Sequence, residues 1–264
     1  MTASLRITLL QLDGSPLPGP ILGMGRTGVV VEQDDDTALK LPLKYGTTGL
    51  SKAQVEHHSI LTDISCESLQ REKDVYKRLG QDHGIVSCLD LSGAGIKMAL
   101  MKNGNLHDYM AQHHSAHSVQ LAWFRDMARA LVHIHHRRVI VADIATRNFL
   151  LDADLSVKFS DFTESTVLPL DTDMQAADDA GYSIYTDIGQ MGTVIYGVVT
   201  GQRCEFDLFK DQPPGPATAA WPQRKDLPST QNIWLGSIIE KCWTKGAYQN
   251  ARDLLAALDL VVLE

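Results

Sequence analysis

Short apolar runs separated by polar turns make up about the first hundred residues, a pattern typical of β-strands. The runs at 29–31 and 38–41 flank an acidic turn at 33–36, which predicts a β-hairpin. One helix is expected over 67–79, because its apolar side chains fall on one side of a helical turn. Further strands are expected at 4–12, 85–86 and 96–101.

From about residue 105 onward, the apolar positions follow a helical period instead. In the segment 119–137, Leu121, Phe124, Ala128 and Leu131 recur at intervals of three and four residues, which predicts an amphipathic helix. The other expected helices are 187–199, 233–243 and 251–262, with a proline-rich loop at 212–228. The change of period predicts an α+β fold, β-rich before the junction at 103–105 and helical after it.

Composition narrows the class of protein. The 264 residues are 44% hydrophobic and 21% charged, so the chain is expected to be globular and to bury roughly 75% of its unfolded surface. This length allows one large domain or two small lobes. The net charge of −8 argues against a general nucleic-acid or anionic-membrane binder, because phosphate contacts need a basic face.

Cysteine usage and hydropathy point to a soluble, cytoplasmic protein. The four cysteines are widely scattered, without a C-x-x-C pair, which excludes a cysteine-based zinc site and is typical of reduced thiols. No run approaches the ~18 apolar residues of a membrane span, and the N-terminal residues lack a secretory pattern. We therefore expect no membrane partner.

A glycine-rich turn precedes the predicted hairpin. Gly23, Gly25 and Gly28 form a G-x-G-x-x-G pattern, in which backbone amides can approach a phosphate because no Cβ intervenes. The pattern alone is weak, and the hairpin after it disfavours a dinucleotide-binding fold, in which a helix should follow. It therefore indicates either a phosphate-binding loop or a simple glycine-rich turn.

Lys40 lies within the apolar run that forms the second strand of the hairpin. Such a lysine normally points to solvent, but across the hairpin from a glycine loop it could neutralise phosphates. It would then need a carboxylate to hold it. Glu72, in the helix expected over 67–79, is the best candidate, and Glu67 and Glu56 are weaker ones.

The strongest chemical signal is an Asp, an Asn five residues later and a second Asp after a short predicted hairpin. These residues, Asp143, Asn148 and Asp161, would make an oxygen-rich pocket of the kind that Mg²⁺ prefers. Asp143 could accept a hydroxyl proton while Asn148 and Asp161 hold the metal. Each residue alone could instead cap a helix or a turn.

In this order the motifs resemble those of a eukaryotic protein kinase, over roughly residues 20–262. The D-x-A-x-R-N form of the loop at 143–148 and the Cys242-Trp243 pair are similar to tyrosine kinases. The segments 147–152 and 242–248 are also similar to small fungal kinase-like proteins. The resemblance implies that Lys40, Glu72 and Asp143 are catalytic and that Asn148 and Asp161 bind metal. It implies nucleotide contacts from Gly23, Gly25, Gly28, Val30, Ala38, Lys40, Met98, Ala99 and Met101.

The resemblance also implies an architecture and a reaction. It implies a single bilobal kinase domain over 1–264, with an N-lobe at about 1–98, a hinge at about 99–104, a C-lobe at about 105–264 and the nucleotide in the cleft. Asp187 would tie down the catalytic loop. The implied reaction transfers the γ-phosphate of Mg-ATP to a protein hydroxyl, so the expected cofactors are ATP and Mg²⁺.

Three departures from the kinase pattern leave other functions open. Val141 and Ala142 replace the family's His-Arg, Thr163 replaces the glycine of Asp-Phe-Gly, and the short segment 161–187 lacks Ala-Pro-Glu. Because that segment is the family's peptide platform, the chain could be a nucleotide-binding pseudokinase that acts as a scaffold. A small-molecule phosphotransferase is a third alternative, since its Asp-x4-Asn loop is similar.

The same segment carries nearly all of the net charge. Residues 161–187 contain seven acidic residues and no Lys or Arg, so the rest of the chain sums to only −1. A solvated loop is one interpretation. The other is that the carboxylates replace regulatory phosphates or attract a basic protein partner.

Overall fold

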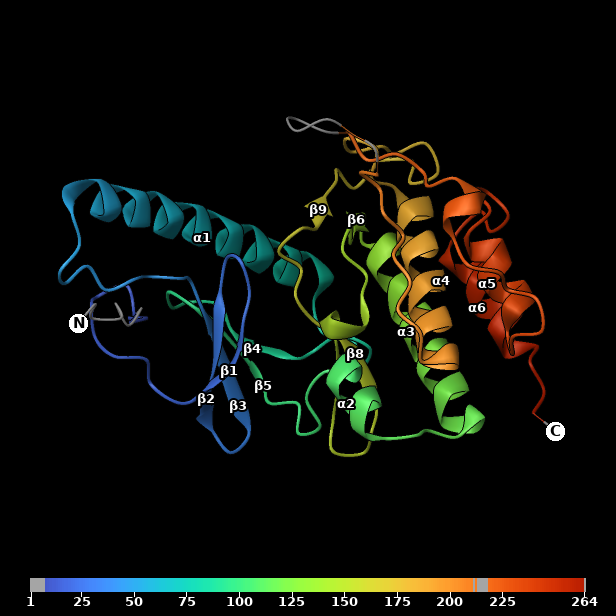
Figure 1. Ribbon diagram of the computed structural model, residues 1–264, viewed down its shortest axis with the longest axis horizontal. Coiled ribbons are helices and arrows are strands. Elements are labelled where there is room, and N and C mark those ends of the chain that lie inside the picture. The colour runs from blue at the N-terminus through green and yellow to red at the C-terminus, as the bar shows by residue number, and fades with distance from the viewer. Residues whose placement is uncertain (1–7, 211, 213–217, 264) are drawn as a thin grey trace, which may run out of the picture. The chain divides into compact units, whose positions relative to one another are not determined.

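The computed structural model describes residues 8–210, 212 and 218–263, which form two compact units (Figure 1). The first unit runs to Lys77 and includes Ser87–Leu100; the second comprises Arg78–Val86 and continues from Met101. Within these described ranges, no helix combines the length and the apolar character needed to cross a membrane.

A five-stranded antiparallel sheet dominates the first unit (Figure 1). Its strands are β1 Ile21–Met24, β2 Val29–Asp34, β3 Thr37–Leu41, β4 Cys88–Asp90 and β5 Ile96–Ala99, in the spatial order β1-β2-β3-β5-β4. The predicted hairpin is confirmed as β2 and β3. The strand expected at 96–101 is β5, which ends two residues earlier.

The strand register separates the two faces of this sheet. One face packs in a buried apolar cluster made of Val29, Val31, Leu41 and Leu43. Because side chains alternate along a strand, Val30 and Lys40 point to the opposite face. Val30 lies directly across from Lys40, and Ala38 lies across from Met98. Four of the predicted nucleotide-contacting residues therefore share one face of the sheet.

Helix α1, Lys52–Leu79, lies beside the sheet (Figure 1) and begins 15 residues before the helix expected at 67–79. Its C-terminal half buries the predicted side, including Leu69 and Val75. Its N-terminal half is mostly exposed, with apolar side chains such as Ile60 and Ile64 open to solvent. That half carries no continuous apolar stripe, so periodicity alone does not predict it.

The second unit is mainly helical. Its helices are α2 Leu106–Gln112, α3 His117–His136, α4 Ile184–Thr200, α5 Gly236–Cys242 and α6 Ala251–Asp259. Helix α3 packs against α6 and α4, and α4 also packs against α5. The last four correspond to the helices expected at 119–137, 187–199, 233–243 and 251–262. With the sheet of the first unit, they confirm the α+β fold class.

Short strands flank Asp143, Asn148 and Asp161 along the chain. Strand β6 Val139–Ile140 pairs with β9 Thr166–Val167, and β7 Phe149–Leu151 pairs with β8 Val157–Phe159. Two 3-10 turns are η1 Thr146–Asn148 and η2 Arg224–Asp226. The second of these interrupts the loop expected at 212–228, of which 213–217 lie outside the described residues.

Two predicted strands need correction. Of the strand expected at 4–12, residues 4–7 lie outside the described residues, and Leu9 and Leu10 form only isolated bridges. Gly14, with a φ of 89°, turns the chain back on itself, so the bridge of Leu10 to Pro16 does not extend into a ladder. At 85–86, Ile85 is buried but makes a single bridge, so its apolar character reflects core packing rather than strand pairing.

Candidate functional site

The first unit holds Lys40 in a buried ion pair. Its Nζ lies 2.6 Å from the Glu72 Oε2, and the two side chains are 9% and 0% exposed. Glu56 and Glu67, the weaker candidates for this contact, are exposed on α1. Lys40 therefore does not point to solvent, as a lysine in a strand ordinarily would. Removing either partner would leave a buried charge.

The glycine-rich turn joins β1 to β2 beside this pair. The Gly25 amide donates to the Gly28 carbonyl at 2.9 Å, which closes the turn. A Cβ on Gly28 would stand 3.2 Å from the Lys40 Cε, so a side chain there would press on the lysine. A Cβ on Gly23 would meet nothing within 4 Å. The third glycine of the pattern thus makes room for the buried lysine.

The segment predicted to contact an adenine ring is the end of β5 and the residues after it. Met98 is 5% exposed. The amides of Ala99 and Leu100 donate to backbone carbonyls of the first unit at 3.0 and 2.8 Å. These two amides are therefore engaged within the protein. Met101 is buried and belongs to the second unit.

The second unit brings Asp143 and Asn148 together. The Asn148 Nδ2 donates to the Asp143 Oδ2 at 3.0 Å and to the Asp143 carbonyl at 2.9 Å. The Arg147 Nη2 also lies 2.6 and 2.7 Å from the two carboxylate oxygens of Asp143. The sequence pattern assigns no role to Arg147, although its place four residues after Asp143 is a spacing at which side chains meet in a helical turn.

Asp161 follows β8 at a turn with left-handed backbone. Its φ is 59°, a conformation that Asp tolerates better than most residues. Thr163 donates to the Asp161 Oδ1 through its hydroxyl at 2.6 Å and through its amide at 3.3 Å. The left-handed residue of this turn is Asp161, so position 163 does not need glycine. Thr163 instead orients the predicted metal ligand.

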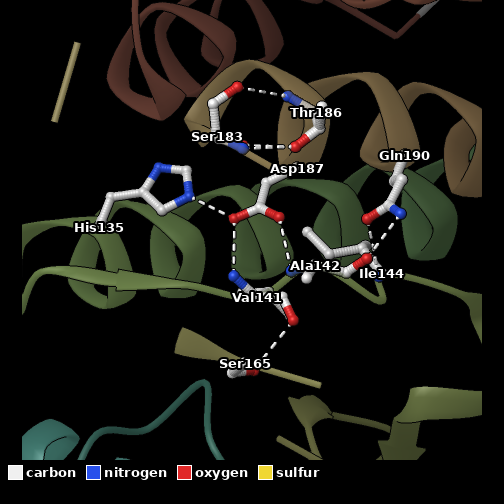
Figure 2. Close-up of polar contacts among 9 residues, drawn as sticks. All are labelled: His135, Val141, Ala142, Ile144, Ser165, Ser183, Thr186, Asp187 and Gln190. Atoms are coloured by element: carbon white, nitrogen blue, oxygen red, sulfur yellow. Dashed lines mark hydrogen bonds and ion pairs between the residues drawn. The ribbon is translucent and has the colours of Figure 1, made fainter. Parts of the chain in front are cut away.

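A buried network holds the backbone that leads into Asp143 (Figure 2). Asp187, near the start of α4, is 0% exposed. Its carboxylate accepts hydrogen bonds from the amides of Val141 and Ala142, each at 2.9 Å. The His135 Nε2 lies 2.9 Å from the same carboxylate. The expectation that Asp187 ties down this loop is confirmed.

Two further side chains complete the network (Figure 2). The Ser165 hydroxyl donates to the Val141 carbonyl at 3.0 Å. Gln190 donates to the Ala142 carbonyl at 2.8 Å and accepts from the Ile144 amide at 3.0 Å. The sequence pattern singles out neither residue, because both contacts join segments more than 20 residues apart in the chain.

The acidic segment 161–187 uses its carboxylates to build turns. Asp173 and Asp178 each accept a hydrogen bond from a backbone amide two or three residues later, at 3.0 and 2.8 Å. Asp179 accepts one from the Thr166 hydroxyl at 2.6 Å. These bonds within the segment give three of its acidic residues a structural role that requires no binding partner.

Comparison with known proteins places this chain in a family. The family model described as protein tyrosine and serine/threonine kinase matches residues 22–185, more than half of the chain. The chain therefore belongs to the protein tyrosine and serine/threonine kinase family. The resemblance to eukaryotic protein kinases inferred from the motifs is confirmed.

Relatives of both kinase specificities are similar to this chain. The probable serine/threonine-protein kinase MARK-B of Dictyostelium discoideum is 26% identical over 157 residues, 52% of this chain and 22% of the relative. Serine/threonine-protein kinase STY17 of Arabidopsis thaliana is 22% identical over 210 residues, which cover 74% of this chain and 36% of the relative. Tyrosine-protein kinase Mer of Mus musculus is 27% identical over 161 residues, which cover 54% of this chain and 15% of the relative. The chain thus spans at most 36% of the length of these relatives.

Proposed function

We propose that this chain transfers the γ-phosphate of Mg-ATP to a protein hydroxyl, and that residues 1–264 act as one kinase domain. The observation that carries the proposal is the buried Lys40–Glu72 ion pair. It lies on the sheet face that Val30, Ala38 and Met98 share. A lysine held by a carboxylate beside an apolar surface suits a ligand with phosphates at one end and a flat base at the other.

Each unit supplies a different part of the proposed chemistry. In the first, Lys40 neutralises phosphate charge, and the turn of Gly23, Gly25 and Gly28 lets backbone amides approach the phosphates. The base would bond backbone groups of Ala99 and Met101. Because the amides of Ala99 and Leu100 are engaged, the amide of Met101 is the proposed donor.

In the second unit, Asp143 orients the acceptor hydroxyl and takes its proton, and Asn148 and Asp161 are the residues that would hold Mg²⁺. Asn148 turns its amide nitrogen toward Asp143, which directs its amide oxygen elsewhere. Asp161 offers an exposed carboxylate. Bound Mg²⁺ would supply charge neutralisation for the phosphates.

The donor set fits Mg²⁺ bound together with a nucleotide. Among the residues that the structure describes, no cluster of three His, Cys, Asp or Glu side chains is placed to hold a metal ion. Mg²⁺ typically takes one or two carboxylates from a protein and completes its shell with substrate phosphates and water. Two oxygen donors from this loop region are therefore the expected contribution of the protein.

A nucleotide-binding scaffold without catalysis is the second candidate. Arg147 contacts both carboxylate oxygens of Asp143, so an acceptor hydroxyl would have to displace it. The two side chains are 61% and 35% exposed, and an ion pair this exposed is worth about 1 kcal/mol or less. The displacement would therefore cost little, so this contact does not argue against the enzyme.

Thermal unfolding of the full chain with increasing Mg-ATP tests nucleotide binding. At a nucleotide concentration about 100 times Kd, the stabilisation should reach about 2.7 kcal/mol. Asp161→Asn should reduce its Mg²⁺-dependent part. Asp154→Asn is a matched control, because Asp154 is an exposed turn aspartate that accepts from the Ser156 amide. Failure of Mg-ATP to stabilise the wild-type chain would contradict the proposal.

Radiolabelled ATP tests phosphotransfer, with autophosphorylation and a peptide library as acceptors. Asp143→Asn should lower the transfer rate by about 100-fold and leave the stabilisation by Mg-ATP in place. A wild-type chain that binds Mg-ATP and transfers nothing would establish the scaffold instead. Preferential labelling of basic peptides would support attraction of a basic partner by the segment 161–187.

A further inference from the structure

Gln190 bonds the backbone on both sides of Asp143 (Figure 2). Its Nε2 donates to the Ala142 carbonyl at 2.8 Å, and its Oε1 accepts from the Ile144 amide at 3.0 Å. A glutamine side chain holds its carbonyl and its NH₂ group at a constant separation. This pair of bonds therefore sets the spacing of the two peptide groups that flank Asp143.

Gln190 acts beside a second support from the same helix. It follows Asp187 by three residues on α4, so the two side chains leave the same face. Asp187 accepts hydrogen bonds from the amides of Val141 and Ala142. Gln190 bonds the next groups along the chain, the Ala142 carbonyl and the Ile144 amide. The two side chains together hold a continuous stretch of backbone up to Asp143 and just beyond it.

The backbone held in this way is strained. Ala142 has a φ of 67°, a left-handed conformation that is unfavourable for a residue with a Cβ. Its amide bonds Asp187 and its carbonyl bonds Gln190, so hydrogen bonds on both sides oppose relaxation. Such strain persists only where the surroundings over-determine the conformation. Because Ala142 directly precedes Asp143, its conformation sets the direction in which the Asp143 side chain leaves the chain.

We propose that Gln190 is a positioning residue for phosphotransfer and acts on Asp143 through the peptide groups at 142 and 144. The carboxylate of Asp143 itself is contacted by Arg147 and Asn148. Losing Gln190 would leave that carboxylate chemically intact and free its backbone to relax. The inference rests on the proposed function, because positioning Asp143 matters to the rate only if Asp143 takes part in the transfer.

Two substitutions test the inference in the full chain. Gln190→Leu removes both hydrogen bonds at nearly the same side-chain size. Gln190→Glu keeps an acceptor for the Ile144 amide and loses the donor to the Ala142 carbonyl. Gln190→Leu should lower kcat by roughly 10-fold or more, because small misplacements of reacting groups are costly. The KM for ATP should stay within about twofold of the wild-type value. The kcat of Gln190→Glu should lie between those of Gln190→Leu and wild type.

A second readout needs no nucleotide. Exchange of the Ile144 amide with deuterium should be faster in Gln190→Leu, because that amide loses its acceptor. Gln120→Leu is the matched control: Gln120 is a buried glutamine on α3 that donates to the Ser115 carbonyl at 3.1 Å. It should leave both kcat and the exchange of the Ile144 amide unchanged.

The outcomes separate the inference from the proposed function. Wild-type kcat in Gln190→Leu, or a change confined to KM, overturns the role of Gln190 and leaves the kinase proposal standing. A wild-type chain that transfers no phosphate overturns the kinase proposal, and the role of Gln190 with it. If Gln190→Leu does not fold, Gln190→Glu decides, and an unchanged kcat in that variant overturns the inference.

Discussion

Two ion pairs of equal length contrast in their surroundings. The Lys40–Glu72 pair of the first unit and the Arg147–Asp143 pair of the second both have an N···O distance of 2.6 Å. The side chains are 9% and 0% exposed in the first pair and 61% and 35% exposed in the second. The contrast teaches that the length of an ion pair says little about what the pair does.

Burial makes the first pair a permanent part of the fold. Both charges have left water, so each depends on the other. In the exposed pair, water competes for both charges, and the pair contributes about 0–1 kcal/mol. The contact between Arg147 and Asp143 can therefore be broken at little cost. A buried pair suits a residue that holds one position, and an exposed pair suits a residue that must change partners.

Breaking the buried pair should have the largest effect. Glu72→Ala would leave Lys40 buried without its carboxylate, and the free energy of unfolding should fall by about 3–5 kcal/mol. Urea denaturation measures the loss. Glu67→Ala is the control, since Glu67 is exposed on the same helix, and it should change the free energy by about 0.5 kcal/mol or less. A similar small change for Glu72→Ala would refute the contrast between the two pairs.

Removing the buried acceptor of the backbone that leads into Asp143 should have the second-largest effect on stability. Asp187→Ala would leave the amides of Val141 and Ala142 without their acceptor, at a cost of about 2–4 kcal/mol. Asp253→Ala is a matched control, because Asp253 accepts one amide bond, from Gln249, near the start of α6. Thermal unfolding of both variants compares them. Equal losses would mean that burial of Asp187 adds nothing to its role.

The exposed pair should contribute little to stability. Arg147→Ala should change the free energy of unfolding by about 1 kcal/mol or less. Arg129→Ala is closely matched, since Arg129 pairs with Asp126 at 2.6 Å and the two side chains are 58% and 42% exposed. Both variants should unfold alike, while Arg147→Ala alone should change the rate of phosphotransfer. A large loss of stability in Arg147→Ala but not in Arg129→Ala would show that the exposed Arg147–Asp143 pair is as important to the fold as the buried Lys40–Glu72 pair.

A second exposed ion pair, between Arg224 and Glu240, should have the smallest effect on stability, and this effect should change only at acidic pH. Hydrogen bonds from Arg224, and then from the Thr230 hydroxyl, lower the pKa of Glu240 from its ordinary 4.5. A carboxylate whose pKa is lower in the folded state contributes stability above its unfolded pKa and loses it as the pH falls through the folded value. Because the two side chains are 41% and 39% exposed, the contribution should be small.

Comparison of wild type with Glu240→Gln isolates this contribution. The difference in unfolding free energy should be constant above pH 4.5 and should shrink below it. A difference that stays the same through the acid range would show that the charge of Glu240 is not involved.

Elements with strong local patterns were predictable, and those defined by packing were not. The hairpin of β2 and β3 follows from two apolar runs around an acidic turn, and α3 follows from its spacing of apolar residues. The exposed first half of α1 lacks such a stripe. The buried run at 85–86 looks like a strand, yet it is packed in the core without regular pairing.

The candidate site divides in the same way. Residue types and short spacings were enough to bring out Lys40, Asp143, Asn148 and Asp161, and to point to the kinase family, because that information lies within a few neighbouring positions. Tertiary packing decided that Glu72 holds Lys40. It also placed Gln190 against Ile144 and Ala142, which lie 46 and 48 residues earlier in the chain. Periodicity tells which side of an element is buried, but it does not tell which distant polar group a buried atom will meet. That choice depends on how the elements pack, because a buried charge or peptide group must find its partner inside the folded chain.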